Sequence, residues 1–252
     1  MSGKRVLAVC GKGGVGKTTV SALLARELRA DERHRYLVVD ADPAVGLGMA
    51  LRRFPRLTVN DMRSELIDAV RERATDSVDL AASIDYKMME IVEEDGNLAF
   101  LSVGRPEEEG CYCQLNTLLR EAIETLSSHF HLTLIDAEAG VEQVNRRVMR
   151  SVSHLLLVSD VTVKGLRVAE SIREVAAQAV AYRKLGLLLN RVGDEEEAAR
   201  LLSSSDLPFL GYVPEDDTVK DHDARGADFL EIPSCPALLA VRRCVLESGF
   251  LD

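Results

Sequence analysis

Short runs of mainly apolar residues recur along this chain, and most of them end in a polar residue or a glycine. Such runs are typical of strands that are buried on both faces of a parallel sheet. Between them lie longer stretches whose apolar residues recur every three or four positions, the period of an amphipathic helix. The runs predict strands at residues 5–10, 35–40, 98–103, 131–136, 153–159, 185–191 and 209–213.

The stretches between these runs predict helices. The helical period begins at Lys17 and returns at residues 115–126, 166–179 and 237–246. Residues 58–95 are rich in charge and contain no glycine, and we expect short helices there that cover one edge of the sheet. Strands that alternate with helices predict an α/β fold with a three-layer, doubly wound and mostly parallel sheet, in a single domain over residues 1–252.

A glycine-rich loop joins the first predicted strand to the first predicted helix, and it fits the phosphate-loop pattern of Gly, four residues, Gly, Lys and Thr. Glycines let the backbone curl around an anion because no Cβ stands in the way, and the loop amides and the helix N-terminus then face the phosphates. In such a loop Lys17 neutralises the β- and γ-phosphates, and Thr18 offers its hydroxyl to Mg²⁺. The predicted nucleotide-binding residues are Gly11, Lys12, Gly13, Gly14, Val15, Gly16, Lys17, Thr18 and Thr19.

Acidic residues stand at the ends of two further predicted strands. Asp40 and Asp42 follow the second strand, and Asp136 follows the fourth. Ligands of open α/β sheets bind outside the carboxyl ends of the strands, so we expect these acids to face the phosphate loop. A strand-terminal aspartate after an apolar run is the Walker B arrangement, which holds Mg²⁺ through water. The alternative for Asp40 and Asp42 is a structural role in the turn that follows the strand.

Two cysteines, Cys111 and Cys113, lie just before the helix predicted at 115–126. In extended backbone their side chains share one face, about 7 Å apart, so both sulfurs can turn toward one ion. A tetrahedral site needs four ligands, and a two-fold dimer would supply the other two from a second copy. The helix N-terminus favours thiolates, which suit Ni²⁺ or Zn²⁺ better than Mg²⁺. The alternative is two cysteines with no shared role.

Composition narrows the function classes further. The chain has 252 residues and a net charge of −10, so no broad basic face is expected for nucleic acid or anionic lipid. No apolar run reaches the roughly 18 residues of a membrane span, and a predicted strand begins almost at once. Five unevenly spaced cysteines do not suggest a disulfide framework. These features predict a cytoplasmic protein with no nucleic-acid partner and no stable membrane association.

The phosphate loop carries a second lysine, Lys12, that phosphate binding does not need. Together with Asp-x-Asp-Pro at 40–43 and Asp-x-x-Ala-Gly-x-Glu at 136–142, it resembles the deviant Walker A ATPases, the group of the nitrogenase iron protein and the Min, Par and Mrp proteins. The resemblance implies a P-loop NTPase fold of the MinD and nitrogenase iron protein type. It also implies that Lys12 reaches a partner subunit's nucleotide, so that hydrolysis requires a homodimer. The alternative for Lys12 is a solvated side chain.

The same resemblance implies roles for individual residues. The implied catalytic residues are Lys12, Lys17, Asp42 and Asp136, and the implied Mg²⁺ ligands are Thr18, Asp40 and Asp136. Asp42 would position or activate the attacking water, and the Gly140 amide would sense the γ-phosphate. The remaining implied nucleotide contacts are Asn190 at the adenine edge with its neighbour Arg191, and the base-packing segment Val213, Pro214 and Glu215.

Within that group, Cys-Tyr-Cys before a helix together with both switch motifs looks like the nickel-inserting maturation ATPases of carbon monoxide dehydrogenase. This resemblance implies an ATP- and Mg²⁺-dependent homodimer that carries Ni²⁺ or Zn²⁺ between its subunits through Cys111 and Cys113. ATP hydrolysis would change the dimer geometry and release nickel to a client metalloenzyme, which is carbon monoxide dehydrogenase in that group.

Three other functions fit parts of the sequence. A nitrogenase iron protein needs a second cysteine after the Asp136 switch, and residues 137–152 contain none. A Min- or Par-like positioning ATPase needs a basic amphipathic tail or a basic DNA-binding face, whereas the last helix here carries only Arg242 and Arg243. A nickel-storage module would use nucleotide only to fold or dimerise, and measured ATP turnover separates it from an ATPase.

Overall fold

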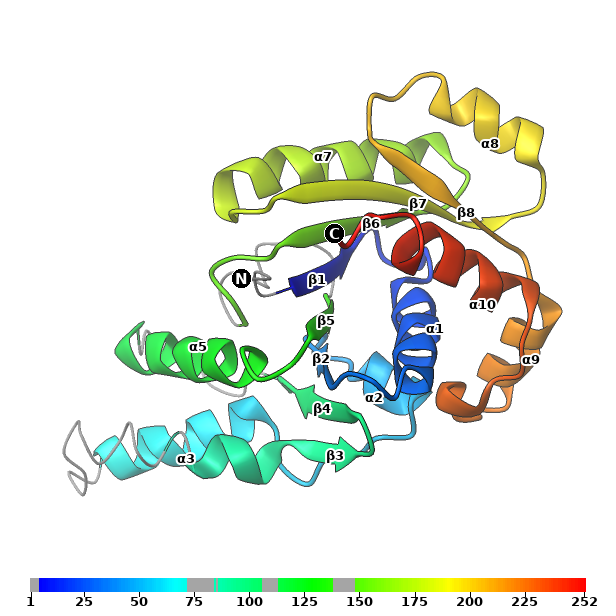
Figure 1. Cartoon of the computed structure of the whole chain (residues 1–252). Coiled ribbons are helices and arrows are strands. Elements are labelled where there is room, and N and C mark those ends of the chain that lie inside the picture. The colour runs from blue at the N-terminus through cyan, green and yellow to red at the C-terminus, as the bar shows by residue number, and fades with distance from the viewer. Residues whose placement is uncertain (1–4, 72–83, 85, 106–112, 138–147) are drawn as a thin grey trace.

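The computed structural model describes residues 5–71, 84, 86–105, 113–137 and 148–252. In this part of the chain eight strands form one sheet with the order β3-β4-β2-β5-β1-β6-β7-β8 (Figure 1). The strands are β1 (Arg5–Cys10), β2 (Tyr36–Asp40), β3 (Glu93–Asp95), β4 (Leu98–Ser102), β5 (Leu132–Asp136), β6 (His154–Ser159), β7 (Lys184–Val192) and β8 (Phe209–Pro214). Neighbours pair in parallel except β3 and β4, so the predicted mostly parallel sheet is confirmed.

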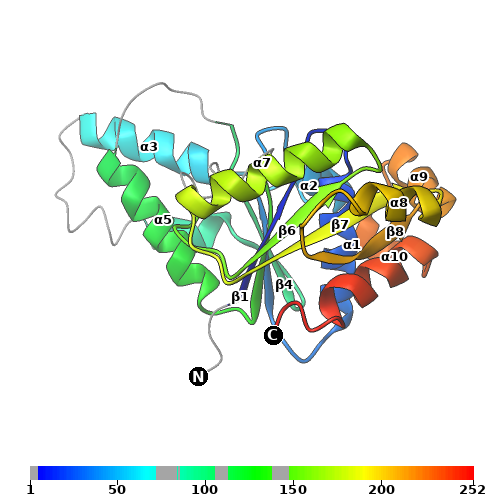
Figure 2. The same cartoon turned by 90° about the horizontal axis from the view of Figure 1, so that it is seen from above.

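Helices connect these strands and cover both faces of the sheet (Figures 1 and 2). They are α1 (Lys17–Ala30), α2 (Gly46–Ala50), α3 (Val59–Arg71), α5 (Cys113–Ser127), α7 (Val163–Ala179), α8 (Glu195–Leu202), α9 (Asp217–Ala224), η1 (Phe229–Glu231), α10 (Pro236–Val241) and η2 (Arg242–Leu246). The helix predicted at 237–246 therefore consists of α10 and one further segment, η2, that has the wider π-helical turn.

Each face of the sheet carries its own hydrophobic core, which confirms the three-layer arrangement. α3, α5 and α7 pack on one face, and α1, α2, η1 and α10 pack on the other. Strand β1 serves both cores, because Val6 and Ala8 face the first layer of helices and Leu7 and Val9 face the second. These side chains are at most 2% exposed, as expected for a central parallel strand.

The prediction of helices alone for residues 58–95 is wrong at its end. α3 and the helical residues 86–91 agree with it, but residues 93–95 form the antiparallel edge strand β3. A tight turn at Gly96, whose φ is +62°, returns the chain into β4. Arg29 of α1 binds Asp95 and Asn97 on either side of this turn. Contacts with a distant helix therefore fix a strand whose own sequence is entirely acidic.

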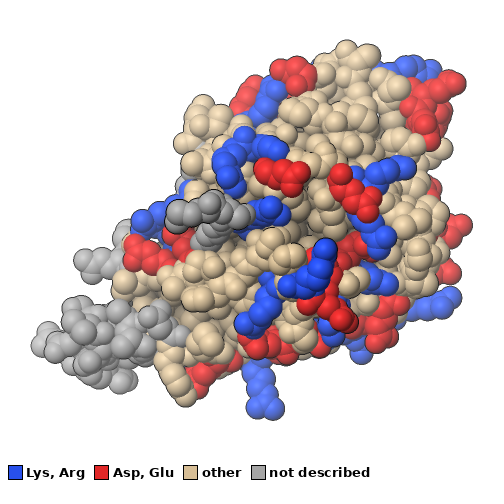
Figure 3. Space-filling model, in the orientation of Figure 1, with Lys and Arg blue, Asp and Glu red and all other residues tan. Residues whose placement is uncertain are grey.

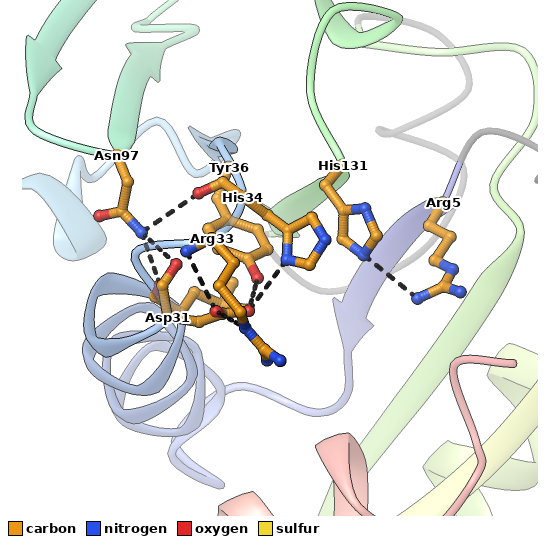
Figure 4. Close-up of polar contacts among 8 residues, drawn as sticks. Arg5, Asp31, Arg33, His34, Tyr36, Asn97 and His131 are labelled. Atoms are coloured by element: carbon orange, nitrogen blue, oxygen red, sulfur yellow. Dashed lines mark hydrogen bonds and ion pairs between the residues drawn. The ribbon is translucent and has the colours of Figure 1, made fainter.

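A polar cluster joins elements at the amino ends of the strands, the side of the sheet opposite the phosphate loop (Figure 4). The Asp31 carboxylate lies 2.7 Å from Arg33 Nε, 3.1 Å from His34 Nδ1 and 2.6 Å from the Tyr36 hydroxyl. The His34 ring stacks on His131, with 3.9 Å between ring centroids, and Arg5 lies beside His131. The cluster thereby ties the end of α1 to the starts of β1, β2 and β5.

Charged side chains of both signs are interspersed on the face of the molecule in Figure 3, and the described residues there do not gather into one broad basic area. None of the helices in the described ranges combines the length and the apolar character that a membrane span requires.

Candidate nucleotide site

The phosphate loop and the acidic residues meet at the carboxyl edge of the sheet. Gly11 directly follows β1, and Asp136 ends β5, which pairs with β1. Asp40 ends β2 and is the register partner of Asp136 in the parallel β2–β5 pair. The sheet order thus brings together three segments that are far apart in sequence.

At two positions of the loop only glycine fits, because any side chain would clash with a neighbouring strand. A Cβ atom on Gly11 would lie 2.2 Å from the carbonyl oxygen of Val158 in β6. One on Gly16 would lie 2.3 Å from Asn190 Nδ2, and Gly16 has a φ of +89°, which favours glycine. The loop therefore packs directly on β6 and β7, and α1 begins one residue after Gly16.

Residues of β7 bind the carbonyl groups of the loop. Asn190 Nδ2 donates to Val15 O at 2.8 Å, and Arg191 donates from its guanidinium to Gly14 O at 3.2 Å. Asn190 is 4% exposed, and Arg191 has a left-handed φ of +58°. Both residues expected beside adenine therefore also hold the phosphate loop in shape, a role that the sequence did not indicate.

The two lysines of the loop have different partners. Lys17 is 7% exposed, and its Nζ donates to Lys12 O at 3.2 Å. Lys12 extends in another direction, with Nζ 3.9 Å from Asp160 Oδ2. The side chain of Lys17 thus stays within its own loop, and that of Lys12 reaches the loop after β6.

Asp136 binds two hydroxyls on consecutive turns of α1. Thr18 Oγ1 donates to Asp136 Oδ2 and Ser21 Oγ donates to Asp136 Oδ1, both at 2.9 Å. Asp136 is 1% exposed and Ser21 is fully buried. These bonds orient the carboxylate toward the start of α1, where the phosphate loop ends.

The electrostatics of this pair of acids suit a divalent cation. Burial raises the pKa of Asp136 to about 7. The hydrogen bonds from Thr18 and Ser21 lower this pKa in part, and the negative charge of Asp40 contributes to the rise. Burial likewise raises the pKa of Asp40 to about 6. A bound cation would favour the ionised form of these two adjacent buried carboxyls. Together with the Thr18 hydroxyl they offer the oxygen ligands that Mg²⁺ prefers. The residues present therefore fit Mg²⁺, which would neutralise phosphate charge there.

Asp40 also organises the segment that carries Asp42. Its Oδ1 accepts from Asp42 N at 3.2 Å, and its Oδ2 accepts from Gly48 N of α2 at 2.9 Å. Asp42 is half-buried, and its Oδ1 accepts from Ala44 N at 2.8 Å. Asp42 thus lies next to Asp40. Its carboxylate is oriented by the bond from Ala44 N and remains accessible to solvent.

The residues expected around the base line one shallow hollow. It is bounded by Thr19 of α1, by Asn190 and Arg191, and by the segment Val213, Pro214, Glu215 and Asp216. Asp216 fixes this segment, because its Oδ1 accepts from Thr218 N at 2.8 Å and its Oδ2 accepts from Ala237 N at 2.9 Å. Burial opposes ionisation of Asp216, but these and further hydrogen bonds lower its pKa overall.

Two predicted site residues lie outside the described residues, namely Gly140 and Cys111. Cys113 is the first residue of α5, so the helix begins two residues before the predicted position 115. In the described ranges no three His, Cys, Asp or Glu side chains gather as a group that could hold a metal ion. The Cys-x-Cys metal site therefore stays a prediction.

Sequence reasoning missed three residues of the site. Ser21 and Asp160 contact predicted site residues directly, and Asp216 fixes the base-side segment. Ser21 could have been found, because it lies three residues after Thr18 and so shares its helix face. Asp216 could have been found as the N-cap of α9, which begins directly after it, although its bond with Ala237 has no local signal. No local signal marks the contact of Asp160 with Lys12, because the two residues are distant in sequence.

Comparisons with known proteins agree with this geometry. A family model described as the CobQ/CobB/MinD/ParA nucleotide binding domain matches residues 6–229. An uncharacterized ATP-binding protein of Methanocaldococcus jannaschii is 32% identical over 90% of this chain and 91% of its own length. The carbon monoxide dehydrogenase accessory protein CooC of Rhodospirillum rubrum is 28% identical over 91% of each chain.

A solved structure shows the same fold. The septum site-determining protein MinD of Pyrococcus horikoshii, complexed with Mg-ADP, matches 97% of this chain and 96% of its own with a TM-score of 0.69 and 20% identity. The family match and the site geometry lead to one assignment. The chain belongs to the CobQ/CobB/MinD/ParA nucleotide-binding family and is a P-loop ATPase of the MinD/ParA type.

Proposed function

We propose that this ATPase is a metallochaperone that delivers nickel to a client metalloenzyme, with carbon monoxide dehydrogenase as the first candidate. Two copies of the chain would dimerise around bound ATP in the cytoplasm, and Cys111 and Cys113 of each copy would share one Ni²⁺ or Zn²⁺ ion. The observation that carries the proposal is the match to the R. rubrum accessory protein of that enzyme, which extends over 91% of both chains.

The nucleotide site supports the ATPase half of the proposal. Thr18, Asp40 and Asp136 would hold Mg²⁺, and Lys17 would neutralise the β- and γ-phosphates. Asp42 would orient the attacking water, and Lys12 would complete the site of the partner subunit. This division of roles agrees with the buried Lys17, which stays within the loop, and with the partly exposed Lys12, whose side chain leaves the loop toward Asp160.

The path of the chain after β4 supports a link between nucleotide and metal. Ser102, the last residue of β4, is the register partner of Asp40, so the chain leaves β4 at the same edge of the sheet. Arg105 Nε then donates to Pro43 O at 2.8 Å, one residue from Asp42. Cys113 begins α5, and a helix N-terminus favours the thiolate form that binds soft metal ions. Arg105 stands six residues before Cys111 in the sequence, and in our proposal a change at Asp42 passes along this segment to the cysteines.

Metal titration of the purified full-length chain tests the proposal. We expect one Ni²⁺ or Zn²⁺ per two subunits, and we expect this ion to be lost in a Cys111→Ser/Cys113→Ser double variant. Metal content and oligomeric state are measured together, with and without ATP and Mg²⁺, because the site needs both subunits.

A Cys244→Ala variant is the matched control, since Cys244 is a buried thiol whose pKa burial raises. This control keeps the wild-type metal content if the proposal is right. Unchanged metal stoichiometry in the Cys111→Ser/Cys113→Ser variant would rule out the Cys-x-Cys site.

The same measurements separate the other candidate functions. A positioning ATPase would turn over ATP without a stoichiometric metal ion, and a nickel-storage module would bind the ion with little ATP turnover. Nickel transfer to a metal-free client enzyme that depends on ATP hydrolysis is the outcome that the metallochaperone proposal requires.

A further inference from the structure

Asp160 lies beside the phosphate loop and has no part in the nucleotide or metal roles described above. It directly follows β6, the neighbour of β1, and so enters the site from the carboxyl edge of the sheet. Its Oδ2 lies 3.9 Å from Lys12 Nζ, and the two side chains are 30% and 31% exposed. The ion pair is therefore partly shielded from solvent, and the Lys12 side chain is exposed enough to move away from Asp160.

The Asp160 carboxylate is fixed by its own loop. Its other oxygen, Oδ1, accepts from Thr162 Oγ1 at 2.5 Å, and Thr162 Oγ1 accepts from Gly165 N at 2.9 Å to cap α7. A Cβ atom on Gly165 would lie 2.1 Å from Asp160 Oδ1, so the glycine provides the space in which the carboxylate sits. Thr162 and Gly165, at the start of α7, thus fix Oδ1, and the other carboxylate oxygen faces Lys12.

Lys12 forms no other ion pair within the described residues. Its backbone oxygen is engaged by Lys17, which anchors the main chain of Lys12 and leaves its side chain to Asp160. In the single subunit the Lys12 ammonium group is therefore held by a carboxylate of the same chain. An ammonium group that acts on a partner's phosphates must first give up this contact.

We propose that Asp160 is a positioning residue that retains Lys12 within its own subunit until nucleotide-dependent dimerisation transfers the ammonium group to the partner's phosphates. The inference rests on the proposed function, in which Lys12 acts across a homodimer. Since the loss of the Lys12–Asp160 contact opposes association, Asp160 sets the protein concentration at which the ATP-bound chain dimerises. Asp160 itself touches no substrate.

The test is an Asp160→Asn variant. The asparagine oxygen still accepts from Thr162, so the cap of α7 is retained while the charge facing Lys12 is lost. We expect the dissociation constant of the dimer, measured by sedimentation velocity with AMPPNP and Mg²⁺, to fall roughly two- to thirtyfold, because each dimer gives up two partly exposed ion pairs and each contributes a factor of up to about five. The difference from wild type shrinks as NaCl is added, because salt screens the pair.

Three controls make the readout specific to the ion pair. Asp160→Glu keeps the charge and stays near the wild-type dissociation constant. Asp194→Asn neutralises an aspartate elsewhere, the N-cap of α8, and leaves the dissociation constant unchanged. In a Lys12→Ala background Asp160→Asn has no further effect, because the partner of Asp160 is already absent.

The possible failures can be told apart. A wild-type chain that stays monomeric with AMPPNP and Mg²⁺ refutes the proposed dimer and, with it, this role. A wild-type chain that dimerises, with an Asp160→Asn variant that associates equally or more weakly, refutes only the role of Asp160. An effect of Asp160→Asn on the dissociation constant that persists in the Lys12→Ala background also refutes the role of Asp160, because it cannot act through Lys12.

Discussion

Lys12 and Lys17 show how two lysines of one loop come to differ. Lys17 begins α1 and is buried, with its head group on the loop carbonyl of Lys12. Lys12 lies in the loop itself, and its head group extends to Asp160. The ammonium group of Lys17 thus stays at the phosphate loop, and that of Lys12 is held by an acidic residue outside it. The sequence pattern already separates their expected roles, and the structure adds the partner of each side chain.

Lys12→Ala is therefore expected to abolish ATP hydrolysis and to leave nucleotide binding intact. Removal of one cationic group that stabilises charge in the transition state lowers kcat by at least roughly 100-fold. The backbone oxygen that accepts from Lys17 is retained in the variant, so the loop keeps its shape. Steady-state ATPase assays and equilibrium titration with a fluorescent ATP analogue measure the two properties.

Lys17→Ala is the matched comparison and should lose binding as well as turnover. Wild-type turnover in the Lys12→Ala variant would show that Lys12 has no catalytic role, in this subunit or across a dimer.

At the scale of elements, one carboxylate connects the base-side segment to the end of the chain. Asp216 caps α9 through Thr218 N and also accepts from Ala237 N at the start of α10. The segment 213–216 that lines the base hollow is thereby held against a helix that packs on α1. The position of the base-side segment thus depends on the C-terminal elements.

Asp216→Ala should lower the free energy of unfolding by about 1–2 kcal/mol, the usual cost of a lost helix cap, and should weaken ATP binding several-fold. Asp194→Ala removes a comparable cap, on α8, which does not line the base hollow. Chemical denaturation and nucleotide titration of both variants separate the two effects. Equal loss of ATP affinity in both would mean that stability alone accounts for it.

At the scale of the whole molecule, the two edges of the sheet serve different purposes. The carboxyl ends of the strands hold the nucleotide site, and the cluster around Asp31 lies at their amino ends (Figure 4). Hydrogen bonds from Arg33, Tyr36 and His34 hold the pKa of Asp31 well below its usual range. A carboxyl whose pKa is lower in the folded chain stabilises the fold above its unfolded pKa of about 3.9, and this contribution is lost as the pH falls below that value.

Asp31→Asn should therefore lower the free energy of unfolding at pH 7, and its difference from wild type should shrink between pH 5 and pH 2. Urea denaturation at several pH values measures the difference. Asp206→Asn, which removes a surface pair with Arg173, should show only a small change at any pH. A difference between Asp31→Asn and wild type that stays constant with pH would mean that the Asp31 charge does not stabilise the fold.

The sequence by itself determined whatever depends on neighbours along the chain. Seven apolar runs became strands. Six of them are mainly buried, as strands covered on both faces are, and the seventh is the edge strand β8, which is only partly buried. The phosphate loop was readable because strand, glycines, Lys17 and Thr18 must follow one another at fixed spacing. The terminal acids of β2 and β5 were placed correctly because parallel strands carry their carboxyl ends to one edge.

Only the tertiary structure decided which distant segments meet. The strand order set Asp40 beside Asp136 and buried both carboxyls, and this burial raises the pKa of each. It also brought Asn190 to the loop carbonyl of Val15, Asp160 to Lys12, and the acidic β3 to an edge position fixed by Arg29. Such contacts follow from the packing of helices on a sheet, which no run of neighbouring residues encodes.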